Sequence, residues 1–174
     1  MYDIEAQRRV LSVGAHNDDV NSVTFADATS SNVFVSGSDD SMLKVWDRRS
    51  LVRGKPAGCL PGHTEGITYI APKGDGRYCI SNSKDQSVRL WDLRTGQAHR
   101  TLLGHTAPIS CVQFDETHLV SGSLDKTVRV WDLRMGSVVD TLHYDYPVTA
   151  LQFDSRKVLV ACGAQALDVR AFFC

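Results

Sequence analysis

The sequence predicts an all-β fold, a β-propeller of about four blades, of which three are regular and one is degenerate. Two observations support this prediction. A Trp-Asp dipeptide recurs at spacings of 45 and 40 residues, and an Ala-His or Gly-His dipeptide precedes each copy. Between these markers, short runs of apolar β-forming residues alternate with turn-forming residues. Repeats of this length and composition are typical of four-stranded propeller blades. The three copies are Trp46-Asp47, Trp91-Asp92 and Trp131-Asp132.

The repeats divide one predicted domain, 1–174, into a first segment and four blades. Tyr2-Asp3 stands 44 residues before Trp46-Asp47 and so occupies the Trp-Asp register of an earlier repeat. We therefore expect the segment 1–14 to hold the outer strand of the closing blade, at Arg9–Val13. The four blades are expected at 15–60, 61–103, 104–142 and 143–174.

The first blade is expected to form three central strands and a fourth, outer strand near Cys59-Leu60. The segment before the outer strand, 48–58, is basic and rich in Gly and Pro, which predicts an exposed loop. The three central strands are expected at Val20–Phe25, Val33–Ser36 and Met42–Trp46.

The second and third blades repeat this pattern. Residues 73–77 of the second blade are interpreted as a hairpin turn, because their two glycines adopt positive φ at low cost. The second blade's strands are expected at Ile67–Ile70, Tyr78–Ser81, Val88–Trp91 and Ala98–Leu102. The third blade's strands are expected at Ile109–Phe114, Leu119–Ser121, Val128–Trp131 and Val138–Leu142.

The fourth blade, 143–174, keeps only the start of the pattern. Residues 147–154 closely repeat residues 108–115, but the markers of the regular repeats are replaced. On a count of 40 residues from the third blade, the replacements are Tyr144-Asp145 for Gly-His, Ala161 for serine, Gln165 for aspartate and Ala171 for tryptophan.

The two ends of the chain are complementary, because the first segment supplies an outer strand and the last blade is expected to lack one. Arg9–Val13 could pair beside the last strand and close the ring, which would remove two exposed strand edges. A fragment of a larger propeller and an assembly of two chains are the open alternatives.

Charge and cysteine content exclude several functional classes. With 19 basic and 20 acidic residues the net charge is −1, which argues against a nucleic-acid-binding protein. The five cysteines form no Cys-x-x-Cys pair, so no metal or cofactor is expected, and their odd number indicates a reducing compartment. The first residues do not form a signal peptide, and no apolar run reaches transmembrane length. These features predict a soluble protein of the cytoplasm or nucleus that does not insert into membranes.

Each regular repeat carries a histidine, a serine, an aspartate and a tryptophan at matched positions. Serine precedes aspartate by four residues and aspartate precedes tryptophan by six in all three sets. Ser, His and Asp form the triad of many hydrolases, but an active site is one arrangement and this set occurs three times. The sequence therefore favours a structural role over catalysis, and no catalytic residue is assigned. The sets are His16, Ser36, Asp40 and Trp46; His63, Ser81, Asp85 and Trp91; and His105, Ser121, Asp125 and Trp131.

With these markers the chain resembles the WD-repeat family of β-propellers over nearly its whole length. The resemblance implies that in each blade aspartate orients histidine, histidine bonds serine, and serine reaches the indole N–H of tryptophan. Such a chain would satisfy polar groups that, if buried without partners, would cost about 1–3 kcal/mol each. We refer to each set of four as a tetrad. The family implies a scaffold that binds proteins and needs no cofactor.

The resemblance also implies a binding face, here called the top rim. Two kinds of loop emerge there: those that connect the outer strand of one blade to the first strand of the next, and those that connect the second strand of a blade to its third. Its exposed positions are the third and fifth residues after the histidine and the residue before the tetrad aspartate. In the first blade, Asp18, Asp19 and Asp39 are expected to lie together and to attract a basic peptide, although an ordinary solvated turn explains them equally well. The positions are Asp19, Asn21 and Asp39; Gly66, Thr68 and Lys84; Pro108, Ser110 and Leu124; and Pro147, Thr149 and Ala164.

The opposite face, the bottom rim, is expected to carry an arginine after each Trp-Asp dipeptide. The sequence Trp-Asp-x-Arg is similar to the box through which WD-repeat substrate receptors engage the adaptor of the cullin-four RING ubiquitin ligase. The resemblance implies charged contacts with that adaptor, whereas a structural interpretation pairs each arginine with the preceding aspartate or leaves it solvated at a strand end. The arginines are Arg49, Arg94 and Arg134.

The two halves of the chain resemble different branches of the family. Residues 1–95, with YDIEAQRRVLSVGAHNDDVNSVTFAD and GDGRYCISNSKDQSVRLWD, resemble the eleventh associated factor of the cullin-four ligase. Residues 96–163, with GHTAPISCVQFDETHLVSGS and WDLRMGSVVDTLHYDYPV, resemble the fungal mitochondrial-division adaptor. The first resemblance predicts a substrate-receptor-like adaptor in ubiquitin conjugation. The second predicts a fission adaptor that binds a dynamin-like GTPase and sits on the cytosolic face of the mitochondrial outer membrane through a partner.

Overall fold

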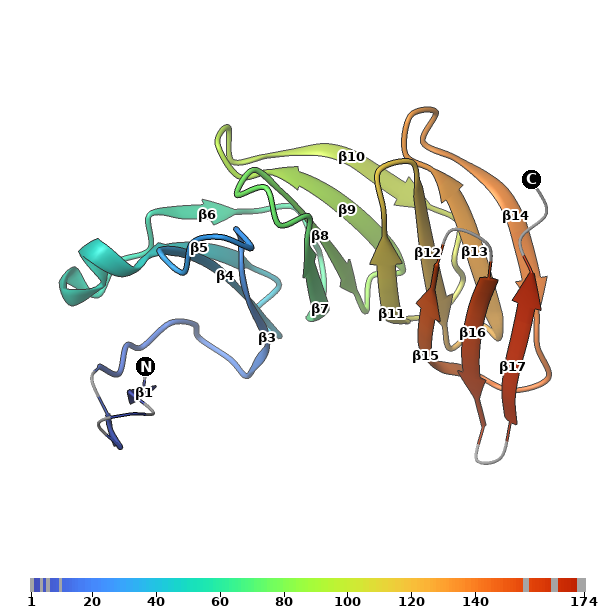
Figure 1. Cartoon of the computed structure of the whole chain (residues 1–174), viewed down its shortest axis with the longest axis horizontal. Helices are drawn as coiled ribbons and strands as arrows, with labels where there is room; N and C mark the ends of the chain where they lie inside the picture. Colours follow the sequence, from blue (N-terminus) through green and yellow to red (C-terminus); the bar gives the residue numbers. More distant parts are fainter. Residues whose placement is uncertain are drawn as a thin grey trace.

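In the computed structural model of this chain, four antiparallel sheets follow one another along an arc, and a separate two-stranded sheet precedes them (Figure 1). The structure describes residues 2–3, 5, 7–9, 11–154, 157–163 and 166–171. Each sheet is a meander in which strands adjacent in sequence pair, so each sheet is one blade. The predicted all-β fold with about four blades is confirmed. The described part of the chain holds no helix with the length and apolarity that a membrane span requires.

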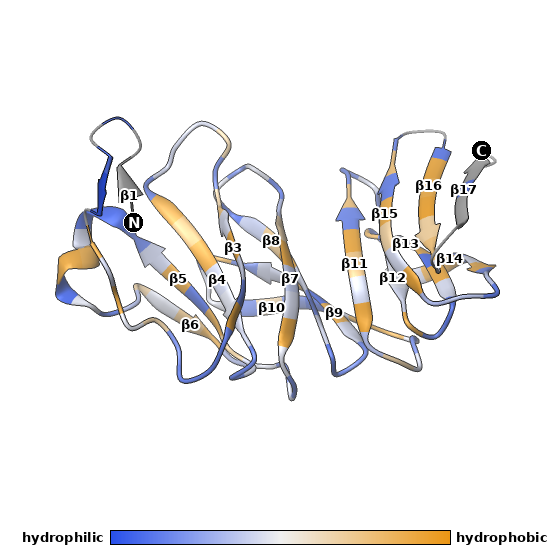
Figure 2. Ribbon diagram, turned by 90° about the horizontal axis from the view of Figure 1, so that it is seen from below, coloured by the Kyte–Doolittle hydropathy of each residue, from blue (hydrophilic) through white to orange (hydrophobic). Residues whose placement is uncertain are grey.

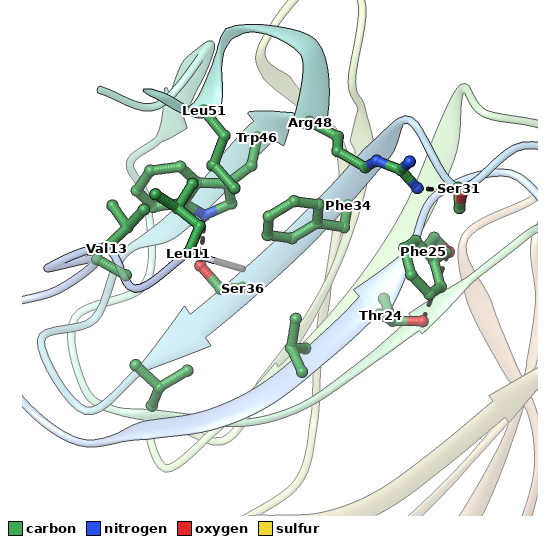
Figure 3. Close-up of a pocket in the computed structure, with 13 residues that line it drawn as sticks. Leu11, Val13, Thr24, Phe25, Ser31, Phe34, Ser36, Trp46, Arg48 and Leu51 are labelled. Atoms are coloured by element: carbon green, nitrogen blue, oxygen red, sulfur yellow. Dashed lines mark hydrogen bonds between the residues drawn. The ribbon is translucent and has the colours of Figure 1, made fainter. Parts of the chain in front are cut away.

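Blade 1 contains four strands and one short 3-10 helix, η1, which replaces the loop that the sequence predicted. The prediction of an exposed loop was wrong for residues 48–53. The carboxylate of Asp47 accepts the backbone N–H of Arg49 and begins the helix, and Gly54 ends it with a φ of +66°. Leu51 is buried and lies over Trp46 (Figure 3). The elements are β3 (Val20–Phe25), β4 (Val33–Ser38), β5 (Leu43–Asp47), η1 (Arg48–Arg53) and β6 (Gly58–Leu60).

Blades 2 and 3 are complete four-stranded meanders, and their strands extend one or two residues beyond most of the predicted ends. The first strand of each carries a β-bulge, which increases local twist. Blade 2 holds β7 (Ile67–Pro72), β8 (Tyr78–Ser83), β9 (Ser87–Asp92) and β10 (Gln97–Leu103). Blade 3 holds β11 (Ile109–Phe114), β12 (His118–Ser123), β13 (Thr127–Asp132) and β14 (Ser137–His143).

Blade 4 has three described strands, and its register corrects the sequence alignment by one residue. Leu151 pairs with Val160 as Val112 pairs with Ser121, so Val160 and not Ala161 stands at the serine position. Arg170 and not Ala171 stands at the tryptophan position, because it pairs with Val158 as Trp131 pairs with Leu119. The offset between the two blades is therefore 39 residues, and the count of 40 was wrong. Gln165 lies outside the described residues. The strands are β15 (Val148–Phe153), β16 (Lys157–Cys162) and β17 (Ala166–Ala171).

The start of the chain does not close the ring within this structure. β1 (Tyr2–Asp3) pairs with β2 (Arg8–Arg9) in a separate two-stranded sheet. Of the predicted outer strand Arg9–Val13, only Arg9 lies in a strand among the described residues, and Val10 lies outside them. This first segment lies beside blade 1, whereas β17 lies at the other end of the arc (Figure 1). Closure by pairing of Arg9–Val13 with the last strand is therefore not what this structure shows.

The apolar core lies between neighbouring blades rather than inside any one of them. Three clusters of buried side chains join blade 1 to blade 2, blade 2 to blade 3, and blade 3 to blade 4. In each cluster, one blade contributes its two middle strands, and blades 1 and 2 also contribute Leu60 and Leu102 of their outer strands. The next blade contributes its first two strands, and blades 2 and 3 also contribute their tryptophan. β8 and β12 each hold five consecutive buried residues, because different neighbours cover the two faces of these sheets.

Candidate functional site

The tetrad of blade 3 forms a continuous chain of hydrogen bonds from the top loops to the core. His105 Nδ1 donates to Asp125 Oδ2 over 2.8 Å, and His105 Nε2 accepts from Ser121 Oγ over 2.8 Å. The indole N–H of Trp131 donates to the same Ser121 Oγ over 2.8 Å. The ionised Asp125 carboxylate can only accept, so Nδ1 of His105 carries a proton. Because burial lowers the pKa of His105 and keeps the ring neutral, Nε2 is left to accept from the Ser121 hydroxyl.

The tetrads of blades 1 and 2 repeat this geometry. Histidine to aspartate, histidine to serine and tryptophan to serine distances lie between 2.7 and 2.9 Å for the shortest bond in each pair. In blades 2 and 3 the tetrad aspartate also accepts from a hydroxyl two residues later, at 2.6 Å in both cases. The three tetrads therefore occupy three separate places, one in each blade. They are His16, Ser36, Asp40 and Trp46; His63, Ser81, Asp85 and Trp91; and His105, Ser121, Asp125 and Trp131.

Burial and hydrogen bonding set the ionisation of these groups. Burial lowers the pKa of His105, and the opposing attraction of Asp125 does not restore it. Burial by itself raises the pKa of Asp125, but the hydrogen bonds from Thr127, the Thr106 N–H and His105 outweigh it and lower the pKa to about 2. The pKa of Asp85 is lowered in the same way, against the effect of burial, by His63 and Ser87. In blade 3 the tetrad therefore pairs a neutral His105 with an ionised Asp125 at neutral pH.

In this arrangement none of the three serine hydroxyls is free to act as a nucleophile. Each hydroxyl is buried and already bonded to both a histidine and an indole. Nucleophilic catalysis requires an accessible hydroxyl beside a base and an oxyanion site. Among the residues that the structure describes, no group of three or more His, Cys, Asp or Glu side chains could hold a metal ion.

The top rim of blades 1 and 2 is tied together by an ion pair that the sequence did not predict. Lys84 Nζ contacts Asp39 Oδ1 at 2.8 Å, and Asn21 Nδ2 donates to the same oxygen over 2.8 Å. The Lys84 hydrogen bond, opposed by partial burial, lowers the pKa of Asp39. Asp39 thus does not join Asp18 and Asp19 as a free acidic cluster. Asp18 and Asp19 remain exposed.

Three residues expected to face a partner instead connect neighbouring blades. Asn21 donates to the carbonyl of Ile67 over 2.9 Å, and Thr68 donates to the carbonyl of Ile109 over 2.9 Å. Ser110 donates to the carbonyl of Val148 over 2.7 Å. A short polar side chain at the same offset in every repeat was the signal available in the sequence. We refer to these three contacts as latches.

The other top-rim positions hold their own loops or face solvent. The backbone N–H groups of Asp39, Lys84 and Leu124 donate to the carbonyls of Asp19, Gly66 and Pro108 respectively, at 2.9 to 3.0 Å. The side chain of Leu124 is exposed. In blade 4, Pro147 and Thr149 are exposed. Ala164 lies outside the described residues.

The three arginines of the bottom rim differ in their partners. Arg49 forms an ion pair with Asp47 at 2.7 Å, and its hydrogen bonds, first from the side chain and then from the backbone, lower the pKa of Asp47 to about 2. Asp92 is instead paired with Arg77 at 3.0 Å. Within the described residues, the guanidinium groups of Arg94 and Arg134 are exposed and have no ion-pair partner; only their backbone N–H groups contact the preceding aspartate. Two of the three guanidinium groups are therefore available.

Comparison with protein families gives one match. The model "WD domain, G-beta repeat" matches residues 7–47, 54–92 and 96–132, which together make up more than half of the chain. These three ranges end at the Asp47, Asp92 and Asp132 that follow the tetrad tryptophans. The match indicates repeats of a kind that serves as a protein-interaction scaffold and does not indicate a catalytic family.

Two curated relatives have names that correspond to both predicted branches. "Mitochondrial division protein 1" of Malassezia globosa is 81% identical over 89 residues, which cover 51% of this chain and 13% of that protein. "DDB1- and CUL4-associated factor 11 homolog" of Caenorhabditis elegans is 44% identical over 116 residues, which cover 65% of this chain and 20% of that protein. The chain thus spans a fifth or less of the length of these relatives.

Two solved structures share the fold of nearly the whole chain. The computationally designed Ika4 protein has a TM-score of 0.81 and 29% sequence identity, over 95% of this chain and 99% of that chain. The computationally designed Ika8 protein has a TM-score of 0.80 and 30% identity, over 92% of this chain and 48% of that chain.

Proposed function

This chain belongs to the WD domain, G-beta repeat family, and from that membership we propose that it is a substrate-receptor-like adaptor of a cullin-RING ubiquitin ligase. It acts without catalysis of its own. The bottom rim binds the adaptor subunit of the ligase, and the top rim binds a second protein or peptide. Its location is the cytoplasm, the nucleus or both.

The observation that carries this proposal is the availability of two arginines on one rim. Arg94 and Arg134 follow their tryptophans at the same offset and emerge from the equivalent loops, β9 to β10 and β13 to β14. Both are exposed, so a partner carboxylate can approach either guanidinium without first breaking an ion pair. The relative named for association with DDB1 and CUL4 supports the same assignment. The near-neutral net charge favours protein partners over nucleic acid.

The test is binding of the purified chain to the ligase adaptor, with charge-reversed arginines. The double variant Arg94→Glu and Arg134→Glu should weaken binding about 100-fold, because two attractive contacts become repulsive. Arg49→Glu is the matched control on the same rim. Its expected effect is smaller, because Arg49 is already paired with Asp47. Equal binding by the wild type and the double variant would contradict the proposal.

A second function has its own support. The high identity to a protein named for mitochondrial division favours a fission adaptor that binds a dynamin-like GTPase at the cytosolic face of the outer membrane through a partner. A pull-down with this chain as bait separates the two, because it retains either the ligase adaptor or the GTPase. Retention of neither would reject both pathways and leave the scaffold.

A further inference from the structure

The two end blades each expose the face that every internal blade buries. Between blades, the first strand of the following blade lies in the apolar core, where Ile67, Ile109 and Val148 are 0 to 1% exposed. The equivalent residue of blade 1, Val20, is 49% exposed, and Val23 is 65% exposed. We call this surface of β3 and β4 the front face.

The front face is apolar and hollowed. A cavity of about 480 Å³ opens over it, lined by Phe34, Trp46 and Leu51 together with Leu11 and Val13 of the first segment (Figure 3). Most of the lining residues are apolar, and the polar ones are Thr24, Ser31, Ser36 and Arg48. Phe25, which continues the face, is 56% exposed. Exposed apolar surface of this extent is typical of an interface.

The opposite end of the arc carries the complementary surface, here the rear face, on β15 and β16. Leu159 is 39% exposed, whereas Val35, Ile80 and Val120 at the same place in blades 1 to 3 are fully buried by the next blade. Figure 2 shows hydrophobic colour on β16 and on β4, at the two ends of the molecule. The two faces are thus the two halves of the contact that the chain makes three times internally.

The latch donor is also present on the rear face. The single hydroxyl hydrogen of Thr68, and likewise that of Ser110, lies within hydrogen-bond distance of two carbonyls, one in its own blade and a nearer one in the first strand of the next blade. Thr149, at the same position in blade 4, donates to the carbonyl of Ala161 in its own blade. Thr149 is exposed, and within the described residues no following blade supplies the second carbonyl.

We infer that a second copy of this chain covers both faces, head to tail, to form a closed ring of two chains. The rear face of each copy packs on the front face of the other, and Thr149 of each copy donates to the carbonyl of Val20 of the other. This chain superposes on 48% of the longer designed chain, so the rest of that chain is about as long as a second copy of this arc. Two identical heterologous contacts then close with twofold symmetry and leave neither face exposed.

The first segment fits this arrangement. Val13 stands three residues before His16, as Leu60 and Leu102 stand before His63 and His105. Leu60 and Leu102 are buried residues of the outer strands β6 and β10. Leu11–Val13 therefore holds the register of an outer strand, and in the two-chain ring it lies beside β17 of the other copy. The outer strand of blade 4 is then supplied between chains rather than within one.

The test is the mass of the chain in solution by sedimentation equilibrium, over a range of concentrations. The wild type should have twice the monomer mass of 19.2 kDa. Val23→Asp on the front face should give a folded monomer, with dissociation about 100-fold or more easier, because a carboxylate would be buried without a partner. Val139→Asp, the same change at an exposed valine of β14, should leave the dimer intact. Thr149→Val keeps the shape and removes the latch, and should weaken the dimer a few-fold.

Mixing two variants tests the head-to-tail geometry. Val23→Asp disables the front face and Leu159→Asp disables the rear face, so each alone should be monomeric. The mixture should form a heterodimer through the one contact in which both faces are wild type. A wild-type monomer at every concentration would overturn the inference, since the faces would then belong to further blades or to another protein. A mixture that stays monomeric would overturn the head-to-tail arrangement.

Discussion

Blades 3 and 4 fill the same buried position of their second strand with different side chains, a serine in blade 3 and a valine in blade 4. In blade 3, Ser121 lies buried at the centre of a polar chain that reaches from Trp131 to Asp125. In blade 4, Val160 stands at the serine position, fully buried in the apolar cluster shared with blade 3. The comparison shows that the core between blades forms without a tetrad. The tetrad adds a connection between that core and the top loops, which carry the rim.

The largest expected effect comes from removing the tryptophan that blade 4 does without. Trp131→Ala should lower the free energy of unfolding by about 3–5 kcal/mol, because a buried indole leaves a large cavity between blades 2 and 3. The change is measured by urea denaturation followed by circular dichroism. Val139→Ala, at an exposed position of β14, is the control and should change stability by less than about 0.5 kcal/mol. A loss of similar size in both variants would show that the tryptophan has no special role.

Asp125→Ala should destabilise the protein by about 2–3 kcal/mol, because it leaves the Thr106 N–H and the His105 Nδ1–H without their acceptor. The same denaturation measurement applies, with Asp140→Ala, an exposed carboxylate in β14, as the control. Binding of a bottom-rim partner should persist wherever the variant is folded. An activity lost while the denaturation curve stayed unchanged would instead assign Asp125 a direct functional role.

Exchanging the serine and valine between the two blades sharpens the comparison. Ser121→Val should cost about 2 kcal/mol, because His105 and Trp131 each lose a buried partner. Val160→Ser should also destabilise, by about 1 kcal/mol, since it buries a hydroxyl where apolar contacts were present. Both exchanges, valine at position 121 and serine at position 160, are thus expected to destabilise the protein. A stabilising Ser121→Val would show that the polar chain of blade 3 does not contribute to folding.

The smallest effect is a dependence of stability on pH. The folded-state pKa of His105 lies below the unfolded value of 6.5, so the unfolded chain takes up a proton first as pH falls. The contribution of a neutral His105 to the free energy of unfolding is complete above pH 6.5 and declines below it. The contribution of Asp125 is present above 3.8 and is lost as pH falls toward about 2. Denaturation midpoints at neutral pH and at about pH 5 should differ, and less so in His105→Gln. A midpoint independent of pH would contradict the burial of a neutral histidine.

The sequence by itself determined the strands and the tetrads. The strands of β3 and β11 have the predicted bounds, and each histidine meets an aspartate no more than 24 residues away. Both features belong to one repeat, where hydrophobic alternation and fixed offsets are visible in the chain. The same local argument overlooked η1, because the basic and Gly- and Pro-rich composition of the segment does not show that Leu51 is buried over Trp46.

Only the tertiary structure decided how the repeats meet. The latch from Asn21 to Ile67 and the ion pair from Asp39 to Lys84 join residues 46 and 45 positions apart, in different blades. Their partners depend on the twist and separation of two sheets, which no single repeat encodes. The register of blade 4 was likewise fixed by strand pairing once its marker residues were gone. Whether a bottom-rim arginine forms an ion pair depends on which other side chain reaches the aspartate, as Arg77 does at Asp92. That can be read only from the folded surface.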